Sequence, residues 1–153
     1  MLDLAGELFV KMGHDVDIDK TLTGINTNLI PDIFIRNYKA KQSYILDIKV
    51  SYDDQKNFEK NRIDNNTKYT PLASEISAHL RHSVYINVIN VGYLGPWDPI
   101  NDDALKRVGL SNNEISRFAT ALTACALKQS YYIYLSHVTG EKYNANVHIA
   151  HTA

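Results

Sequence analysis

Two short apolar segments of this chain each carry one carboxylate. Asp32 lies in Ile-Pro-Asp-Ile-Phe-Ile, and Asp47 lies in Tyr-Ile-Leu-Asp-Ile-Lys-Val, which also contains Lys49. An ionised group within an apolar segment is costly unless it is paired or binds a metal. Because strand side chains alternate between faces, Asp47 and Lys49 point the same way. Two adjacent strands would therefore present two carboxylates and an ammonium to one place, which is what a magnesium-dependent phosphodiesterase needs. A simple ion pair is the alternative for an isolated Asp-x-Lys, and the second acid favours the metal site.

The strands that position these groups are predicted over 30–36 and 43–52. The connection between them is short and basic, so they should pair antiparallel. The other predicted elements are a helix over 2–12, an edge strand over 14–20, a polar helix from Asp53 or Asp54 to about Asn65, a break over 66–71, a second helical piece over 72–82, a strand over 83–93, a short helix over 101–108 and a long final helix. This order predicts an α/β fold, a mixed sheet flanked by helices.

The long final helix should begin at Ser111, because Ser111 and Glu114 have the spacing of a capping box. Its predicted buried stripe consists of Ile115, Phe118, Ala119, Leu122, Ala126 and Ile133. The tyrosines near its end are assigned to the core and its rim or, if exposed, to contact with a neighbouring domain: Tyr131, Tyr132 and Tyr134. The tail beyond Gly140 should be a loop, with at most one short strand.

Composition indicates an ordinary globular domain. The 153 residues are 44% hydrophobic and 22% charged, and no apolar run is long enough to span a bilayer. The single cysteine, Cys125, excludes an internal disulfide and fits a reducing, intracellular compartment, and the scattered histidines do not favour a zinc site. The formal net charge of −1 is low for a stand-alone nucleic-acid binder, so a DNA-acting chain would segregate its charges or belong to a larger polypeptide.

The aspartates, the lysine and the predicted strands that carry them resemble the restriction-like endonuclease domain at the C-terminal end of certain non-LTR retrotransposon polyproteins. That domain belongs to the PD-(D/E)xK nuclease superfamily. The resemblance covers roughly 2–137. Its motifs are Pro31-Asp32, fourteen residues, Asp47-Ile48-Lys49, then Lys68-Tyr69, the later Gly92-Tyr-Leu-Gly-Pro-Trp and the segment 105–111. It implies an α-β-β-β-α-β core with an added C-terminal long helix. It also implies that 1–153 is one domain of a larger polyprotein, which usually carries a basic, histidine-containing segment before the first helix.

The resemblance implies Mg²⁺-dependent cleavage of target DNA, with Mn²⁺ as the alternative ion. The nick would leave a 3′-hydroxyl from which a reverse transcriptase domain of the same polyprotein copies RNA. Asp32 and Asp47 are the expected metal ligands, with the Ile48 carbonyl and Glu7 as further candidates. Lys49 is expected to orient the attacking water and Lys68 to contact the phosphate, although in some relatives the catalytic lysine has moved to the later position.

Expected DNA contacts lie around this site. They are Arg36, Tyr38, Lys39 and Lys41 on the turn between the two strands, Lys56 and Lys60 on the following helix, and Tyr69. Each lysine could equally belong to a solvated face. Asp15, Asp17 and Asp19 should form an exposed edge that repels DNA, and a second metal site there is not expected.

Two other functions fit the same residues. One is a stand-alone restriction- or resolvase-type nuclease, for which a sharp recognition sequence would argue. The other is a catalytically inactive DNA-binding module of the same fold, for which Mg²⁺ binding without turnover would argue. Under the leading hypothesis, the protein is intracellular and acts in the nucleus on genomic DNA. It is not bound to membranes, and it works as one copy or as two.

Overall fold

The computed structural model describes residues 2–22, 24–25, 27–52 and 54–140 of the chain. The expected tail beyond Gly140 lies outside these residues. The elements, in chain order, are α1 Leu2–Lys11, β1 Asp15–Ile18, β2 Ile33–Asn37, β3 Gln42–Ser51, α2 Gln55–Leu80, β4 Ser83–Gly92, α3 Ile100–Val108 and α4 Asn112–Thr139.

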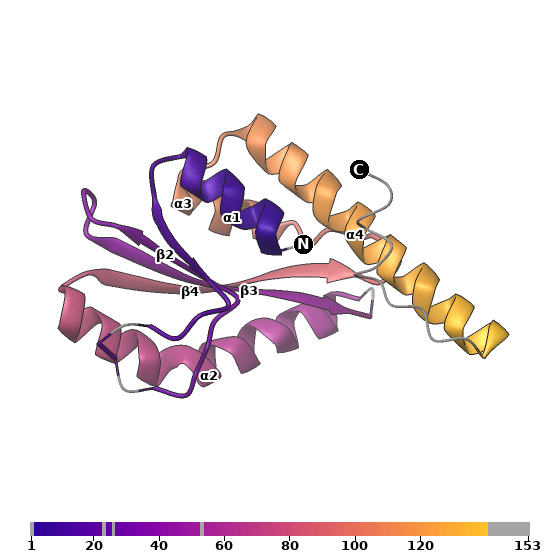
Figure 1. The fold of residues 1–153 in the computed structure, drawn as a ribbon, viewed down its shortest axis with the longest axis horizontal. Coiled ribbons are helices and arrows are strands. Elements are labelled where there is room, and N and C mark those ends of the chain that lie inside the picture. The colour runs from indigo at the N-terminus through magenta and orange to yellow at the C-terminus, as the bar shows by residue number, and fades with distance from the viewer. Residues whose placement is uncertain (1, 23, 26, 53, 141–153) are drawn as a thin grey trace.

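The four strands form one mixed sheet in the order β1-β2-β3-β4. β1, β2 and β3 are antiparallel neighbours, as predicted. β3 and β4 are parallel, so α2 must carry the chain back along the sheet between them. The predicted α/β fold, with its α-β-β-β-α-β core and added C-terminal long helix, is therefore confirmed (Figure 1).

Helices cover both faces of the sheet, with α2 on one face and α1, α3 and α4 on the other (Figure 1). Successive residues of β3 divide between two apolar cores. Leu46 packs with α1, α3 and α4, whereas Ile45 packs against α2. Because side chains alternate along the strand, Asp47 and Lys49 project towards α2. The sheet thus presents the candidate catalytic groups to the face that α2 covers.

β2 begins later than the strand predicted over 30–36. Its ladder with β1 ends at the pair Ile18–Ile33, and Pro31 has no N–H with which to extend it. Asp32 therefore lies immediately before the strand and not within it. Its backbone N–H and its carboxylate are both left to make hydrogen bonds outside the ladder.

The predicted break over 66–71 is wrong, because α2 is one continuous helix of 26 residues. Pro71 lies inside it, on its exposed side. The apolar stripe formed by Tyr69, Leu72 and Ile76 is buried on both sides of the proline and packs against the sheet. Tertiary packing thus maintains the helix through a residue that costs about 3 kcal/mol in a helix interior.

A buried polar network joins α2 to the end of β4, and the sequence patterns did not predict it. Asp98, 2% exposed, forms an ion pair with Arg62 and accepts a hydrogen bond from the Asn90 side chain. Asn101 donates to the Asn90 carbonyl at 2.8 Å and accepts from the Asn90 N–H at 3.0 Å. The Asn101 amide thereby takes the place of a neighbouring strand on this open edge of the sheet.

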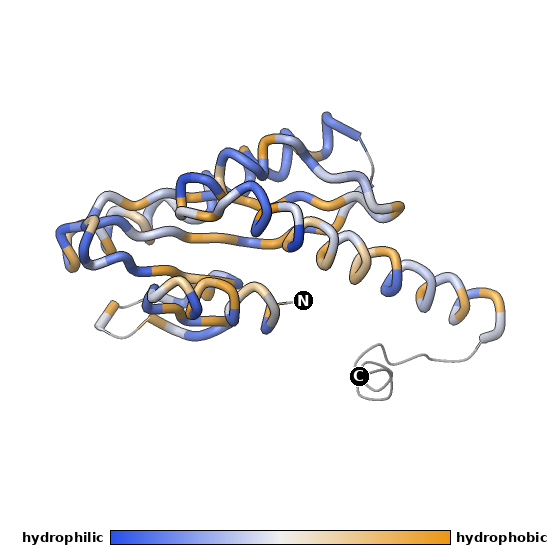
Figure 2. Tube along the Cα trace, turned by 90° about the horizontal axis from the view of Figure 1, so that it is seen from above, coloured by the Kyte–Doolittle hydropathy of each residue, from blue (hydrophilic) through white to orange (hydrophobic). Residues whose placement is uncertain are grey.

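α4 begins with the predicted capping box of Ser111 and Glu114. Its first half packs on the sheet through the buried residues Ile115, Phe118, Leu122 and Ala126. Its second half extends past the sheet and keeps apolar residues along its length (Figure 2). Ile133, predicted on the buried stripe, is 64% exposed, because the sheet no longer lies beneath that turn. Tyr131 and Tyr134 are likewise exposed.

None of the helices within the described residues combines the length and apolar character needed to cross a membrane.

Replacing Pro71 by alanine should stabilise the protein. Pro71→Ala restores an N–H that can bond the Thr67 carbonyl and removes the steric conflict with the preceding turn, so we expect the free energy of unfolding to rise by about 1–3 kcal/mol. Urea unfolding followed by circular dichroism measures it. Glu75→Ala, an exposed change on the same helix, should stay within about 0.5 kcal/mol. A destabilised Pro71→Ala variant would show that the helix requires the proline.

Candidate active site

Asp32 and Asp47 hold each other through reciprocal hydrogen bonds with the backbone. The Asp32 N–H donates to Asp47 Oδ1 at 3.1 Å, and the Ile48 N–H donates to Asp32 Oδ2 at 2.8 Å. The strand register explains why the two aspartates lie together. Ile33 pairs with Leu46, and Asp32 precedes Ile33 while Asp47 follows Leu46, so the two aspartates lie opposite each other. The structure therefore brings the two predicted carboxylates together.

The Asp47 carboxylate is buried, with 2% of the residue exposed. The Tyr69 hydroxyl lies beneath it and donates to Asp47 Oδ1 at 3.1 Å. Burial, followed by the charge and hydrogen bond of Asp47, raises the pKa of Tyr69. The phenol therefore remains a proton donor and fixes the orientation of this carboxylate.

Two ammonium groups approach the other oxygen of Asp47. Lys49 Nζ and Lys68 Nζ each lie 3.8 Å from Asp47 Oδ2. The lysine side chains are 43% and 46% exposed, so both reach solvent at the mouth of the site. Lys68 Nζ also lies 4.5 Å from the centre of the Tyr69 ring. The distance of 3.8 Å exceeds the 2.7–2.9 Å of a tight charge-assisted hydrogen bond, so both ammonium groups stand back from the carboxylate.

Asp32 is destabilised as an anion in this position. Burial raises the pKa of its carboxyl, the Ile48 N–H opposes that effect, and the charges of Asp47 and Asp19 raise the pKa further. Asp19 was not predicted to belong here, although its N–H donates to the Asp32 carbonyl at 2.9 Å. A pair of carboxylates that repel each other in this way is a place where a bound cation gains energy.

The donor set fits a divalent cation such as Mg²⁺. Among the described residues no group of three or more His, Cys, Asp or Glu side chains could hold a metal, so at this place the described residues offer the pair of carboxylates. Mg²⁺ commonly uses one or two carboxylates and takes its remaining ligands from water and substrate phosphates. The Ile48 carbonyl is a further candidate, because the N–H and carbonyl of one strand residue point the same way and this N–H points to Asp32.

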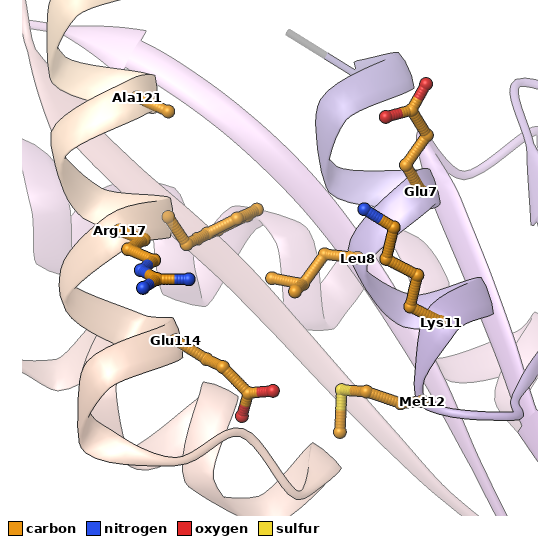
Figure 3. Close-up of a pocket in the computed structure, with 8 residues that line it drawn as sticks. Glu7, Leu8, Lys11, Met12, Glu114, Arg117 and Ala121 are labelled. Atoms are coloured by element: carbon orange, nitrogen blue, oxygen red, sulfur yellow. The ribbon is translucent and has the colours of Figure 1, made fainter.

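The structure does not bring Glu7 to this pair. Glu7 lies on α1, which covers the face of the sheet opposite α2 (Figure 1). It lines a cavity of about 340 Å³ between α1 and α4, across from Glu114 and Arg117 (Figure 3).

Arg36 and its neighbours on the turn between β2 and β3 lie away from the site. Arg36 forms ion pairs with Asp15 at 2.9 Å and Asp17 at 2.7 Å, and its side chain is only 14% exposed. The expectation that Arg36 faces DNA does not fit its burial and these two ion pairs, whereas Asp15, expected on an exposed edge, is exposed. Lys41, at the start of β3, is about 20 Å along the strand from Asp47.

Tyr38 and Lys39 are the other two predicted DNA contacts on that turn. Both are exposed, at the end of the sheet far from Asp47. The Tyr38 hydroxyl lies 3.4 Å from Asp15, and its ring meets the His82 ring edge to face.

The prediction that Tyr69 contacts DNA is wrong, because the Tyr69 side chain is completely buried. Lys56 and Lys60 are exposed on the first turns of α2, beside the end of β3, and Lys60 pairs with Asp64. Lys56 and Lys60 lie one turn apart on the side of α2 turned away from the sheet, whereas Lys68 lies about 80° further round the helix, where it reaches Asp47. Of these three lysines, Lys68 is the one that reaches the candidate site.

No family model matches the chain, and no curated protein matches it. The case for a function therefore depends on the geometry of the site.

Removing the charge of Asp32 should stabilise the fold. Because the pKa of Asp32 is raised on folding, its ionised form opposes folding above that pKa, and this cost disappears below the unfolded value near 3.8. Asp32→Asn keeps an oxygen for the Ile48 N–H, so we expect a higher free energy of unfolding at pH 7 and no gain at about pH 3. Urea titrations in EDTA at the two pH values test this. A variant that is less stable at pH 7 contradicts the assigned electrostatics.

Proposed function

We propose that this chain is a divalent-metal-dependent endonuclease domain that acts on DNA. One observation carries the proposal: two interlocked carboxylates face two ammonium groups at the end of a sheet. Acidic oxygens suit a hard cation, and ammonium groups suit the charge of a phosphodiester. A purely structural ion pair needs neither the second carboxylate nor the second lysine.

Asp32 and Asp47 would hold the metal, with the Ile48 carbonyl as a third protein ligand. When bound, Mg²⁺ would supply a Lewis acid for the phosphoryl oxygen and lower the pKa of a bound water. Tyr69 keeps Asp47 oriented, which leaves Asp47 Oδ2 directed towards the two lysines.

The two lysines would divide the remaining work. Lys49 follows Asp47 on the same strand and the same face, so it is placed to orient the attacking water and stabilise developing negative charge. Lys68 comes from α2 and reaches solvent at the mouth of the site, so it is placed to hold the phosphate. This division supports cleavage of one strand at the mouth of the site.

By its resemblance to the retrotransposon endonuclease domains, the chain would nick target DNA and leave a 3′-hydroxyl for a reverse transcriptase of the same polyprotein. That role places the reaction in the nucleus. The near-neutral net charge supports it, because other domains would then supply much of the affinity for DNA.

Plasmid nicking tests the metal site. Asp32→Asn and Asp47→Asn should each lower the nicking rate at least about a hundredfold, since metal ligands contribute several kcal/mol to transition-state stabilisation. EDTA should abolish nicking, and Mg²⁺ or Mn²⁺ should restore it. Asp103→Asn, an exposed change on α3, should keep the wild-type rate. Full nicking by both site variants, with folding verified by circular dichroism, would reject the proposed function.

Steady-state kinetics on a short oligonucleotide test the division between the lysines. Lys49→Ala should lower kcat about a hundredfold with little change in KM, because its interaction develops in the transition state. Lys68→Ala should mainly raise KM, because it binds the phosphate in both states. Lys106→Ala, an exposed lysine of α3, serves as the control. The reverse pattern would make Lys68 the catalytic lysine.

A further inference from the structure

Two tyrosines are exposed side by side where β3 and β4 end. Tyr52 is 75% exposed and Tyr93 is 39% exposed. Their rings meet edge to face with centroids 5.8 Å apart. Aromatic side chains usually bury most of their surface, so an exposed pair marks a place where something binds. We call Tyr52 and Tyr93 the tyrosine shelf.

The tyrosine shelf is built on ordered backbone. The Tyr93 N–H donates to the Ser51 carbonyl at 3.0 Å, which fixes the end of β4 beside the end of β3. The Ser130 hydroxyl of α4 donates to the Tyr93 carbonyl at 3.0 Å. The turn that follows is closed by the Gly92 N–H, which donates to the Pro96 carbonyl at 2.8 Å. The backbone that carries Tyr93 is therefore held in place by the fold.

The shelf lies at the same end of the sheet as the candidate active site. Tyr52 follows Lys49 by three residues and Asp47 by five. At about 3.3 Å per residue, these separations correspond to at most about 10 Å and 17 Å. Side chains alternate along β3, and the Ser51 hydroxyl accepts a hydrogen bond from Asn61 of α2, so Tyr52 projects to the face opposite Asp47 and Lys49. A strand that reaches both the site and the shelf must therefore bend round the end of the sheet.

The surroundings of the shelf suit a nucleic-acid strand. Lys56, exposed in the first turn of α2, follows Tyr52 by four residues. The nearby Asp54 carboxylate is occupied as the helix cap, because it accepts hydrogen bonds from the Asn57 N–H at 2.7 Å and the Asn57 side chain at 2.9 Å. Alternating lysines and exposed aromatic rings are the means by which proteins bind single strands, the lysines at phosphates and the rings at bases.

We propose that the tyrosine shelf stacks on unpaired bases of the strand to be cut, which makes DNA with unpaired nucleotides beside the cleavage position the preferred substrate. A base within a duplex is already stacked on its neighbours and offers no free face. This inference rests on the proposed nuclease function for its biological sense, but the binding it describes requires no catalysis.

Fluorescence anisotropy in EDTA tests the shelf. The probes are a labelled 20-nucleotide single strand of mixed sequence and the duplex made from it. Tyr52→Ala should weaken single-strand binding about five- to a hundredfold, as expected for the loss of one stacked base, and should change duplex binding less than twofold. Tyr52→Phe keeps the ring and should restore the wild-type affinity. Tyr134→Ala, which removes a tyrosine 62% exposed on α4, is the matched control.

The outcomes separate the two proposals. Unchanged single-strand affinity in Tyr52→Ala overturns the shelf and assigns the tyrosines to a protein partner, even if the wild type nicks plasmid. Equal loss of single-strand and duplex binding also overturns it. Selective loss of single-strand binding supports the shelf even if neither substrate is cut, and in that case only the nuclease proposal fails.

Discussion

The hydrogen bonds that Asp32 and Asp47 exchange with the backbone are the constraint on which the site depends. They form because β2 begins one residue after Asp32, so that the Asp32 N–H donates to the Asp47 side chain and not to a strand. A strand that began two residues earlier would use the Asp32 N–H in the ladder with its neighbour. The short β2 is thus what turns two separated acids into a pair.

The geometry also shows how a fold can keep such a pair stable. The two acids repel each other, and the pKa of Asp32 is raised first by burial and then by the charge of Asp47. Tyr69 and the two lysines offset part of the cost, and the buried Asp98–Arg62 network joins the same helix to the neighbouring strand. The polar groups therefore connect α2 to the sheet at two separate points, while the apolar stripe of α2 fills the space between them.

Much of the fold could be predicted from the sequence because its signals are local. Alternation identified the strands, the short connection after Asn37 implied an antiparallel pair, and Ser111 with Glu114 marked the start of α4. The errors arose where tertiary contacts decide. Pro71 has a local preference against helix, but burial of the residues around it prevails.

The partners of individual side chains were less predictable than the elements. Which acids pair with Arg36 depends on the register between β1 and β2, and no spacing within one segment contains that information. Likewise, Tyr69 was expected to contact DNA, and only the placement of α2 beside Asp47 shows that it is buried. The pairing of Asp32 with Asp47 was predictable because both lie on adjoining antiparallel segments.

The two halves of α4 are maintained by different forces. The half that includes Ile115 and Leu122 is fixed by the sheet beneath it, whereas the half that includes Tyr131 and Val138 extends into solvent. Helical stability in proteins comes mostly from packing of an apolar face, and among the described residues the sheet supports only the first half. The amide protons of the second half will therefore exchange with solvent faster than those of the first half.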